Sequence, residues 1–197
     1  MLPPNSALPR ARNAAATREA MLAAARLRFL EDSYETVTLR DIARDAGVDV
    51  ALVSRYFGGK EELFRQVLRG TDGGDKFTRA ADAPSLAAYL AEMLTSQDAD
   101  HDREGVERLL IILRSASSPK AAEVVRSALS EDVLEPMASF LTGPDAEMRA
   151  SLSLGVLMGT SILRTIMSVD PLRECDVGQV RKRLERILAA ALAETDD

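Results

Sequence analysis

The stretch TVTLRDIARDAGVDVALVSRYFGGKEEL at residues 36–63 restricts the possible folds more than any other part of the chain. It predicts two short helices around a tight turn, followed by the start of a third helix. Thr38 occupies the position of a helix cap, with Asp41 three residues later as in a capping box. Gly47 stands in the turn, where glycine adopts a left-handed backbone without steric cost. Val53 is placed to fill the angle between the two helices. This pattern predicts a helix-turn-helix.

The second helix of this motif, predicted over residues 49–56, has an outward side of small and basic residues. These residues are Val50, Ala51, Ser54 and Arg55. A short helix with such a surface is suited to the major groove of DNA. Arg55 is a candidate for a bidentate hydrogen bond to a guanine edge, with a phosphate contact as the alternative, and Val50 and Ala51 are candidates for packing on thymine methyl groups.

Two residues of the preceding helix are candidates for the DNA backbone. Thr38 is first a helix cap, and its hydroxyl or the adjacent amide is also placed to meet a phosphate. Arg40 lies on the exposed side of the same predicted helix. It is a candidate phosphate contact, and the alternative interpretation is a solvated surface arginine.

The composition predicts an all-helical protein. Of the 197 residues, 46% are hydrophobic and only 4% aromatic, and no region shows a sustained alternation of polar and apolar residues. A first helix is expected over about 17–32, with a further helix beginning at Lys60. Beyond the glycine-rich stretch 70–74, helices are expected over about 85–95, 103–116, 119–129, 131–141, 144–168 and 176–193.

These elements suggest three segments. Residues 1–16 are expected to form a flexible basic lead-in, residues 17–70 a three-helix helix-turn-helix domain, and residues 71–197 a second helical domain. The net charge of -6 argues by itself against nucleic-acid binding. However, residues 1–70 carry 11 basic and 9 acidic side chains, whereas residues 71–197 carry 14 and 22. The basic charge therefore accompanies the helix-turn-helix.

Residues 17–63 resemble the DNA-binding domain of the TetR family of one-component bacterial regulators. The resemblance keeps the spacing of the family without a gap, and Ser33 and Ser54 depart from it at positions where members often have glycine and tyrosine. The matching residues are Arg18, Leu22, Ala25, Phe29, Tyr34, Thr38, Ile42, Ala43, Ala46, Gly47, Val48, Val53, Tyr56, Phe57, Lys60, Glu61 and Leu63.

This resemblance implies contacts to the DNA backbone at two further positions. Tyr56 and Lys60 match family positions that contact the backbone, and their spacing puts both at the edge of the groove. The alternatives are core packing for the tyrosine ring and a helix-start charge for the lysine. Phe29, Ile42, Val53 and Phe57 are interpreted as core residues.

The resemblance further implies a homodimer that binds a roughly palindromic double-stranded operator and carries a small-molecule effector site in its C-terminal domain. Two glycines four residues apart and an apolar face of the last helix indicate the dimer interface. The interface candidates are Gly155, Gly159, Leu184, Ile187, Leu188 and Ala191. Effector-pocket candidates, for which ordinary core packing is the alternative, are Tyr89, Met93, Leu110, Leu113, Met137, Phe140 and Met158.

Two arginines within apolar helical runs, Arg114 and Arg164, need a partner for their charge. An acidic side chain is the expected partner, because a buried charge usually has a partner within the protein. An anionic effector is the alternative.

The remaining residues argue against other classes of function. A helical enzyme, or a ligand-binding dimer without DNA-binding activity, is the alternative to a regulator, but no Ser/His/Asp set or cysteine–histidine pair is evident. His101 lies among Asp98, Asp100 and Asp102 in what is expected to be a solvated loop, so neither a metal site nor a cofactor is predicted. The longest apolar run, residues 152–163, is too short for a membrane span. The sequence thus predicts a soluble, cytoplasmic protein.

Overall fold

The computed structural model describes residues 8–70, 77, 80, 83–96 and 99–194, and the side chains of these residues except 8–13 and 99–102. The chain divides into two compact units. The first unit comprises residues 1–68 and 110–125, and the second comprises 69–109 and 126–197. Residues 110–125, which the sequence-based limits assign to the second domain, therefore lie in the first unit. Within the described ranges all regular elements are helical, in agreement with the predicted fold class.

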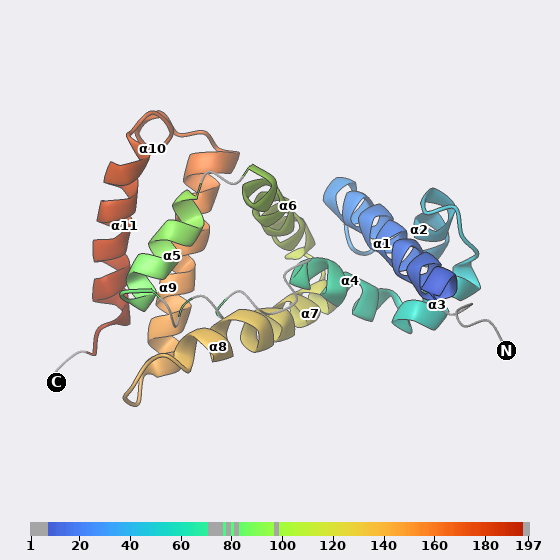
Figure 1. Cartoon of the computed structure of the whole chain (residues 1–197), viewed down its shortest axis with the longest axis horizontal. Helices are drawn as coiled ribbons and strands as arrows, with labels where there is room; N and C mark the ends of the chain where they lie inside the picture. Colours follow the sequence, from blue (N-terminus) through green and yellow to red (C-terminus); the bar gives the residue numbers. More distant parts are fainter. Residues whose placement is uncertain (1–7, 71–76, 78–79, 81–82, 97–98, 195–197) are drawn as a thin grey trace, which may run out of the picture. The chain divides into compact units, whose positions relative to one another are not determined.

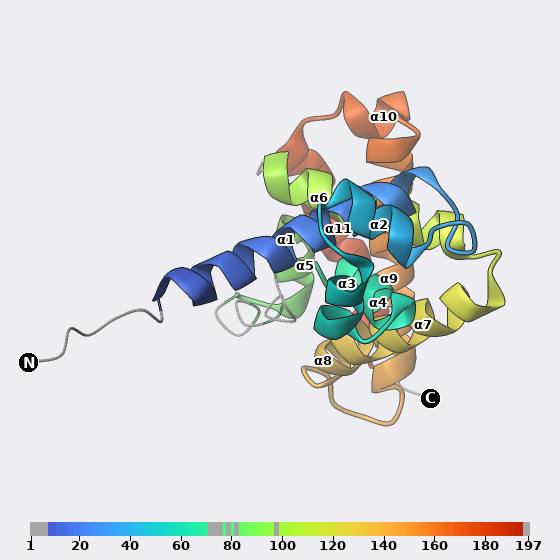
Figure 2. The same ribbon diagram turned by 90° about the vertical axis from the view of Figure 1, so that its right-hand side faces the viewer.

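The first unit is built on α1 (Leu8–Glu31), α2 (Leu39–Asp45), α3 (Val50–Phe57) and α4 (Lys60–Arg69). Helix α1 packs against α2, and α2 packs against α3 (Figure 1, Figure 2). The expected start of the first helix near residue 17 was wrong, because α1 begins nine residues earlier. The alanines before Thr17 are strong helix formers and extend the helix in that direction.

The two short helices of the motif are defined by side-chain caps. Thr38 caps α2, with its hydroxyl oxygen accepting a hydrogen bond from the Asp41 amide at 3.2 Å. Asp49 caps α3, with a carboxylate oxygen accepting from the Ala51 amide at 2.7 Å. Between them Gly47 has φ = +67°, the left-handed conformation predicted for the turn. The helix-turn-helix prediction is confirmed.

The core of the first unit is aromatic at its centre. Phe29 and Phe64 are fully buried, and Tyr34 is 2% exposed. The Phe29 and Phe64 ring centroids lie 4.8 Å apart, and the Tyr34 and Phe64 centroids lie 4.9 Å apart, both in edge-to-face arrangements. Four residues predicted for the core are confirmed there by their burial: Phe29, Ile42, Val53 and Phe57.

The second unit contains a bundle of helices and two π-helical turns. Helices α6 and α7 contribute residues to both units. The elements are α5 (Leu86–Thr95), α6 (Ala99–Ser115), α7 (Pro119–Leu129), a π turn (Ser130–Leu134), α8 (Glu135–Ala138), α9 (Ala146–Ser161), a π turn (Ile162–Ile166), α10 (Asp170–Arg173) and α11 (Val177–Leu192).

Two predictions of helix extent need correction in this unit, and one short helix was not predicted. The helix expected over 131–141 is instead a π turn followed by the short α8, which ends at Ala138. The helix expected over 144–168 is a regular helix only to Ser161 and then widens into a π turn. The short helix α10, with Pro171 in its first turn, was not expected. Hydrophobic periodicity does not distinguish a π turn from an α-helix over so few residues.

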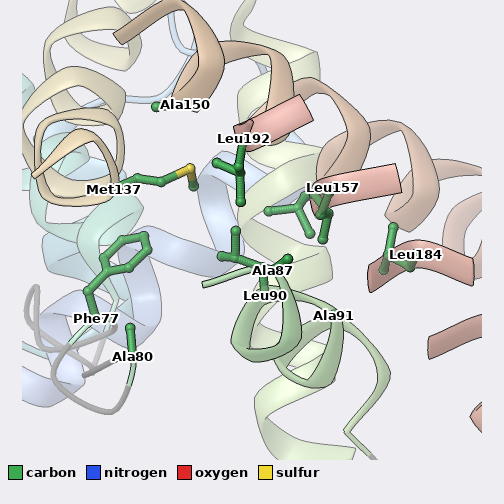
Figure 3. Packing of buried hydrophobic residues seen from close by; sticks show 11 residues of the cluster. Phe77, Ala80, Ala87, Leu90, Ala91, Met137, Ala150, Leu157, Leu184 and Leu192 are labelled. Atoms are coloured by element: carbon green, nitrogen blue, oxygen red, sulfur yellow. The ribbon is translucent and has the colours of Figure 1, made fainter. Parts of the chain in front are cut away.

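The core of the second unit lies where α11 packs against α5 and α9. Leu90 of α5, Leu157 of α9 and Leu192 of α11 belong to one buried cluster (Figure 3). Leu184 and Leu188 also lie in this cluster, at 4% and 0% exposure. Because the chain's own helices already cover these two side chains, their assignment to a dimer interface was wrong. Their four-residue spacing with Leu192 places them on the inward side of α11.

The two arginines expected to pair with acidic side chains bind backbone carbonyls instead. Arg114 donates to the carbonyl of Glu31, the last residue of α1. Arg164 donates from Nη1 to the carbonyl of Leu94 near the end of α5, at 3.2 Å. The last carbonyls of a helix lack partners within the helix and carry its negative dipole end, so they attract a guanidinium.

No helix within the described ranges has the length and hydrophobicity that crossing a membrane requires. Nor do the side chains described here include a group of three or more histidine, cysteine or acidic residues that could hold a metal ion. The polar cluster around His101, with Asp98, Asp100 and Asp102, lies outside the described residues and side chains.

Candidate functional site

The outward side of α3 is formed by Ala51 and, one helical turn later, by Ser54 and Arg55. Ala51, Ser54 and Arg55 are exposed, whereas Val50 is half-buried. On the opposite side Val53 is fully buried and Phe57 is 3% exposed, which attaches the helix to the core of the first unit. The residues proposed for base contacts thus occupy the uncovered side of a helix that is fixed on its other side.

The last turn of α3 is connected to α1. The Tyr56 hydroxyl donates to the carbonyl of Ala14 at 3.5 Å, and the ring is half-buried. The guanidinium of Arg18 lies 5.5 Å from the centroid of the Phe57 ring and also donates to the Gln66 side chain. Arg18, Tyr56 and Phe57 are among the residues of the family resemblance, and their contacts orient the end of α3 against α1.

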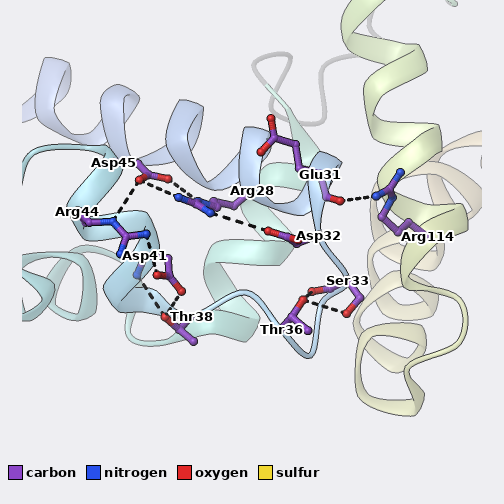
Figure 4. A network of polar contacts seen from close by, with 10 residues as sticks. All are labelled: Arg28, Glu31, Asp32, Ser33, Thr36, Thr38, Asp41, Arg44, Asp45 and Arg114. Carbon is purple, nitrogen blue, oxygen red and sulfur yellow. Dashed lines mark hydrogen bonds and ion pairs between the residues drawn. The ribbon is translucent and has the colours of Figure 1, made fainter.

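A chain of ion pairs connects α1 to α2 (Figure 4). Arg28 of α1 forms a bidentate contact with Asp45, with Nη2 at 2.9 Å from a carboxylate oxygen. Arg44 contacts Asp41 at 2.9 Å. The hydrogen bond from Arg28 lowers the pKa of Asp45, and the hydrogen bond from the Thr38 hydroxyl lowers the pKa of Asp41. The two carboxylates of α2 are therefore neutralised by neighbouring arginines.

The residues predicted to contact the backbone from α2 lie on its exposed side. Thr38 and Arg40 are both exposed. The Thr38 hydroxyl donates to the Asp41 carboxylate at 2.6 Å in addition to accepting from the Asp41 amide. This hydroxyl is already engaged within the helix cap, while no contact of the Arg40 guanidinium is observed among the described residues. Arg40 is thus the better candidate for an external anion.

Lys60, the first residue of α4, contacts an aromatic ring. Its Nζ lies 4.3 Å from the centroid of the Tyr34 ring, the geometry of a cation–π interaction. Burial lowers the pKa of the Lys60 ammonium, and the charge of Lys120 acts in the same direction. Within the described part of the chain Lys60 forms no ion pair with a carboxylate.

A hollow of about 470 Å³ surrounds this lysine. Its walls come from the loop before α2, from the junction of α3 and α4, and from α7. The lining residues are Tyr34, Glu35, Phe57, Gly58, Gly59, Lys60, Glu61, Glu62 and Lys120. Lys120 forms an ion pair with Glu61, and Ser118 donates to the Glu35 carboxylate. Lys120 was not expected at this hollow, because it lies 57 residues beyond the end of the motif along the chain.

The effector-pocket candidates fall into both units. Leu110 and Leu113 belong to the first unit. In the second unit Met137 is fully buried, Tyr89 and Met93 pack on the buried cluster, Met158 is half-buried, and Phe140 is 42% exposed. Phe77, which sequence reasoning missed, lies 6.3 Å between ring centroids from both Tyr89 and Phe140. In the sequence, the sign that Phe77 has a packing role is that it is an aromatic residue in the otherwise mostly polar segment between α4 and α5.

The remaining candidates for a dimer interface lie on an uncovered side of the second unit. Gly155 is exposed and Gly159 half-buried, and a Cβ built on either would meet no atom within 4 Å. Ile187 is 53% exposed and Ala191 half-buried. Met148, Leu152 and Leu163 of the α9 segment, at 55%, 58% and 43% exposure, continue this side with the spacing of one helical face.

Two sequence models of protein families match this chain. "Bacterial regulatory proteins, tetR family" matches residues 21–67, which include α2, α3 and most of α4. "Tetracyclin repressor-like, C-terminal domain" matches residues 85–192, more than half of the chain. No curated protein matches this chain.

Solved structures of similar fold agree with this assignment. A TetR-family regulator from Streptomyces coelicolor A3 is 30% identical, with 89% of this chain and 94% of that chain covered and a TM-score of 0.57. NalD from Pseudomonas aeruginosa is 21% identical, with 90% and 96% covered and a TM-score of 0.66. SmeT, solved as a complex with triclosan, is 21% identical, with 89% and 91% covered and a TM-score of 0.64.

The family models cover both the helix-turn-helix and the helical remainder of the chain, and members of this family are transcription regulators rather than enzymes. This protein belongs to the TetR family of DNA-binding transcription regulators, which are typically ligand-responsive repressors.

Proposed function

We propose that this protein is a repressor that binds a palindromic operator as a homodimer and is released by a small-molecule effector. The DNA-binding part rests on the exposed side of α3, which is formed by Ala51, Ser54 and Arg55. On the opposite side of the helix, Val53 and Phe57 are buried in the core and hold α3 in place. Arg55 supplies the side chain suited to a guanine edge, and the small neighbours permit close approach to the groove floor.

Contacts to phosphate position this helix. Arg40 on α2 and Lys60 at the start of α4 carry cations without an ion pair to a carboxylate among the described residues. The Thr38 cap and Tyr56, with its hydroxyl near the carbonyl of Ala14, hold the adjoining backbone in place. Such contacts fix the orientation of the protein on the duplex and contribute affinity without distinguishing one DNA sequence from another. The contacts to the bases are assigned to Arg55, Val50 and Ala51.

The homodimer is proposed to form through the uncovered side of α9 and α11. Gly155, Gly159, Ile187 and Ala191 remain assigned to it, and Leu152 joins them because it lies on the same side of α9 at 58% exposure. Glycine inside a helix costs roughly 0.5–1 kcal/mol relative to alanine. Since neither glycine is crowded within this chain, its presence is best explained by the close approach of a second copy.

The effector is proposed to be a largely apolar molecule bound within the second unit. Support comes from Tyr89, Phe140 and Phe77, whose rings are neighbours, and from Met93, Met137 and Met158, which offer adaptable apolar side chains. SmeT, a protein of the same fold, forms a complex with triclosan. Leu110 and Leu113 lie in the first unit and are therefore not part of this proposed site.

Fluorescence polarisation with duplexes from the intergenic region beside the protein's own gene tests the DNA-binding part. Binding should weaken linearly with log salt concentration, with a slope of about 0.9 for each phosphate neutralised. Arg40→Ala should weaken all duplexes similarly and reduce this slope by about one. Arg55→Ala should weaken the preferred duplex by about 1–3 kcal/mol and relax the preference at one base position.

The matched control is Arg183→Ala, which removes an exposed arginine of α11 in the second unit. It should leave affinity and salt slope unchanged. An absence of binding to every intergenic duplex at low salt would overturn the proposed function. An equal effect of Arg55→Ala on all sequences would instead reassign Arg55 to phosphate.

A further inference from the structure

The aromatic ring that Lys60 contacts is fixed on two sides by other rings of the core. Tyr34 is 2% exposed, and its ring is in contact with two others of the core. The Phe64 centroid lies 4.9 Å away at an interplanar angle of 61°, and the Phe29 centroid lies 6.0 Å away at 12°. A ring held on two sides cannot move with the lysine, so it defines where the lysine side chain rests.

The two lysines of the surrounding hollow differ in their partners. Lys120 forms an ion pair with Glu61 and is 61% exposed at its side chain. Lys60 has its ammonium over the Tyr34 ring at 4.3 Å and no ion pair with a carboxylate of the described residues. A ring face attracts a cation without neutralising its charge. Lys60 therefore keeps a full positive charge available to an anion from outside the protein.

The position of Lys60 in α4 places this charge at the end of the helix that favours anions. It is the first residue of a ten-residue helix, whose first amide groups lack carbonyl partners within the helix. The positive end of the helix dipole and the lysine charge thus coincide. Glu61 and Glu62 follow directly, so the orientation of the Lys60 stem decides whether the ammonium reaches an anion or a neighbouring carboxylate.

We propose that Tyr34 is a positioning residue for operator binding, which holds the Lys60 ammonium over its ring so that the lysine is already ordered and partly dehydrated before it meets a DNA phosphate. This inference rests on the proposed assignment of Lys60 to the DNA backbone. Lysine has many rotamers, and restricting them before binding removes part of the entropic cost of the contact. Partial burial likewise removes part of the dehydration cost.

A double-mutant cycle in the full-length protein tests this proposal. Lys60→Met should weaken operator binding and reduce the salt slope by about one phosphate. Tyr34→Leu should weaken binding by about fivefold, the scale of a cation–π contact, but leave the salt slope unchanged, because the lysine still reaches its phosphate. Tyr34→Phe keeps the ring and should bind within twofold of the original chain. In the Lys60→Met background, Tyr34→Leu should cause no further loss.

A purely structural role of Tyr34 would give a different pattern. Tyr34→Leu would then weaken binding equally with and without Lys60, and this equality would overturn the proposal. The Lys60 pKa, followed by NMR of 13C-labelled lysine in a chain with four lysines, gives a second readout. It should change in Tyr34→Leu but not in Tyr34→Phe. An unchanged pKa in Tyr34→Leu would also overturn the proposal, even if that variant were destabilised.

Failure of the underlying assignment is distinguishable from failure of the positioning role. If Lys60→Met leaves affinity and salt slope unchanged, the assignment of Lys60 to phosphate is wrong and the proposal falls with it. If Lys60→Met weakens binding but Tyr34→Leu does not, only the positioning role is overturned. Lys182→Met is the control, since it removes an exposed lysine of α11 in the second unit and should show no coupling to Tyr34.

Discussion

Arg149 of α9 donates a hydrogen bond from Nη1 to the carbonyl of Leu192, the last residue of α11, at 2.8 Å. A second bond from the same guanidinium reaches the carbonyl of Thr142. The residue is only 6% exposed. Among the described residues this buried arginine has no ion pair with a carboxylate, and its position is explained by the negative end of α11, where terminal carbonyls lack partners within the helix. Arg108 makes the equivalent contact with the carbonyl of Arg69, the last residue of α4, at 3.1 Å.

Arg149→Met is therefore expected to destabilise the second unit although no ion pair is lost. The substitution keeps most of the aliphatic volume but leaves the carbonyls of Leu192 and Thr142 without these donors. Each buried polar group left unsatisfied costs about 1–3 kcal/mol. Urea unfolding monitored by circular dichroism should show a lower midpoint with an unchanged slope.

Arg183→Met is the control for this comparison, because Arg183 is exposed on α11. Its effect should stay within about 0.5 kcal/mol, as is usual for surface positions. Equal stabilities of the Arg149 and Arg183 variants would show that water replaces the guanidinium without cost.

Gly47→Ala tests the turn of the helix-turn-helix. A Cβ at this position would meet no atom within 4 Å, so sterics with neighbours contribute nothing. The backbone at φ = +67° still disfavours any side chain, by roughly 1–2 kcal/mol. Thermal unfolding should therefore detect a loss of stability, and Gly47→Asn should lose less, since asparagine tolerates this conformation better.

Gly105→Ala is expected to change the stability in the opposite direction, because this glycine lies inside α6. This glycine also has open space around a Cβ, and its φ is not in the left-handed region. Alanine should stabilise the chain here by roughly 0.5–1 kcal/mol. If both glycine variants changed stability in the same direction, the conformational argument for Gly47 would fail.

Local chemistry made the helix-turn-helix predictable from sequence. The Thr38 cap, the left-handed Gly47 and the start of α4 at Lys60 depend on residues within a few positions of one another. Capping and turn preferences act over such distances, so a single sequence contains them. The same reasoning placed Ala51, Ser54 and Arg55 on one side of α3, where the structure has them exposed.

Contacts between distant segments were not predictable in this way. Leu184 and Leu188 read as an apolar helix face, but periodicity cannot say whether the chain itself or a partner covers that face. Arg114 and Arg164 were expected to pair with carboxylates. Their actual acceptors are carbonyls at the ends of distant helices, and a sequence does not show which helix ends will lie near an arginine. The contact of Lys60 with Tyr34 likewise depends on how two loops meet.

The bidentate contact between Arg28 and Asp45 should make stability depend on pH in a defined direction. The hydrogen bond from Arg28 lowers the Asp45 pKa below its value in the unfolded chain, about 3.9. Such a group contributes stability in full above the unfolded pKa, and this contribution is lost as the pH falls through the folded pKa. The stability difference between the original chain and Arg28→Met should thus shrink as the pH is lowered from about 4.

Urea unfolding at several pH values between 7 and 3 measures this difference. Arg173→Met is the control, because its contacts with Asp170 and with Glu174, the residue after α10, join exposed side chains at 3.7 and 3.9 Å. Its difference from the original chain should be small at every pH. A difference for Arg28→Met that stayed constant from pH 7 to pH 3 would exclude Asp45 as the titrating partner.

Gly159→Leu separates the proposed dimer contact from folding. Within this chain a Cβ at Gly159 meets no atom within 4 Å, and the backbone is helical, so the substitution should leave the monomer folded or slightly more stable. Between two copies, however, the added side chain would hold the α9 helices apart. Sedimentation equilibrium should show a weaker dimer. Operator binding should weaken in parallel, because the α3 helices of both copies must bind the operator together.

Ile187→Glu on α11 tests the same surface by a different chemistry. Ile187 is 53% exposed, so a carboxylate costs little in the monomer but would be desolvated in the dimer. Leu27→Glu is the matched control, since Leu27 has the same exposure on α1 in the first unit. It should leave the dimer unchanged. If Gly159→Leu and Ile187→Glu both sediment as the original chain does, the α9 and α11 surface is not the dimer interface, and the two glycines must be explained by some other partner.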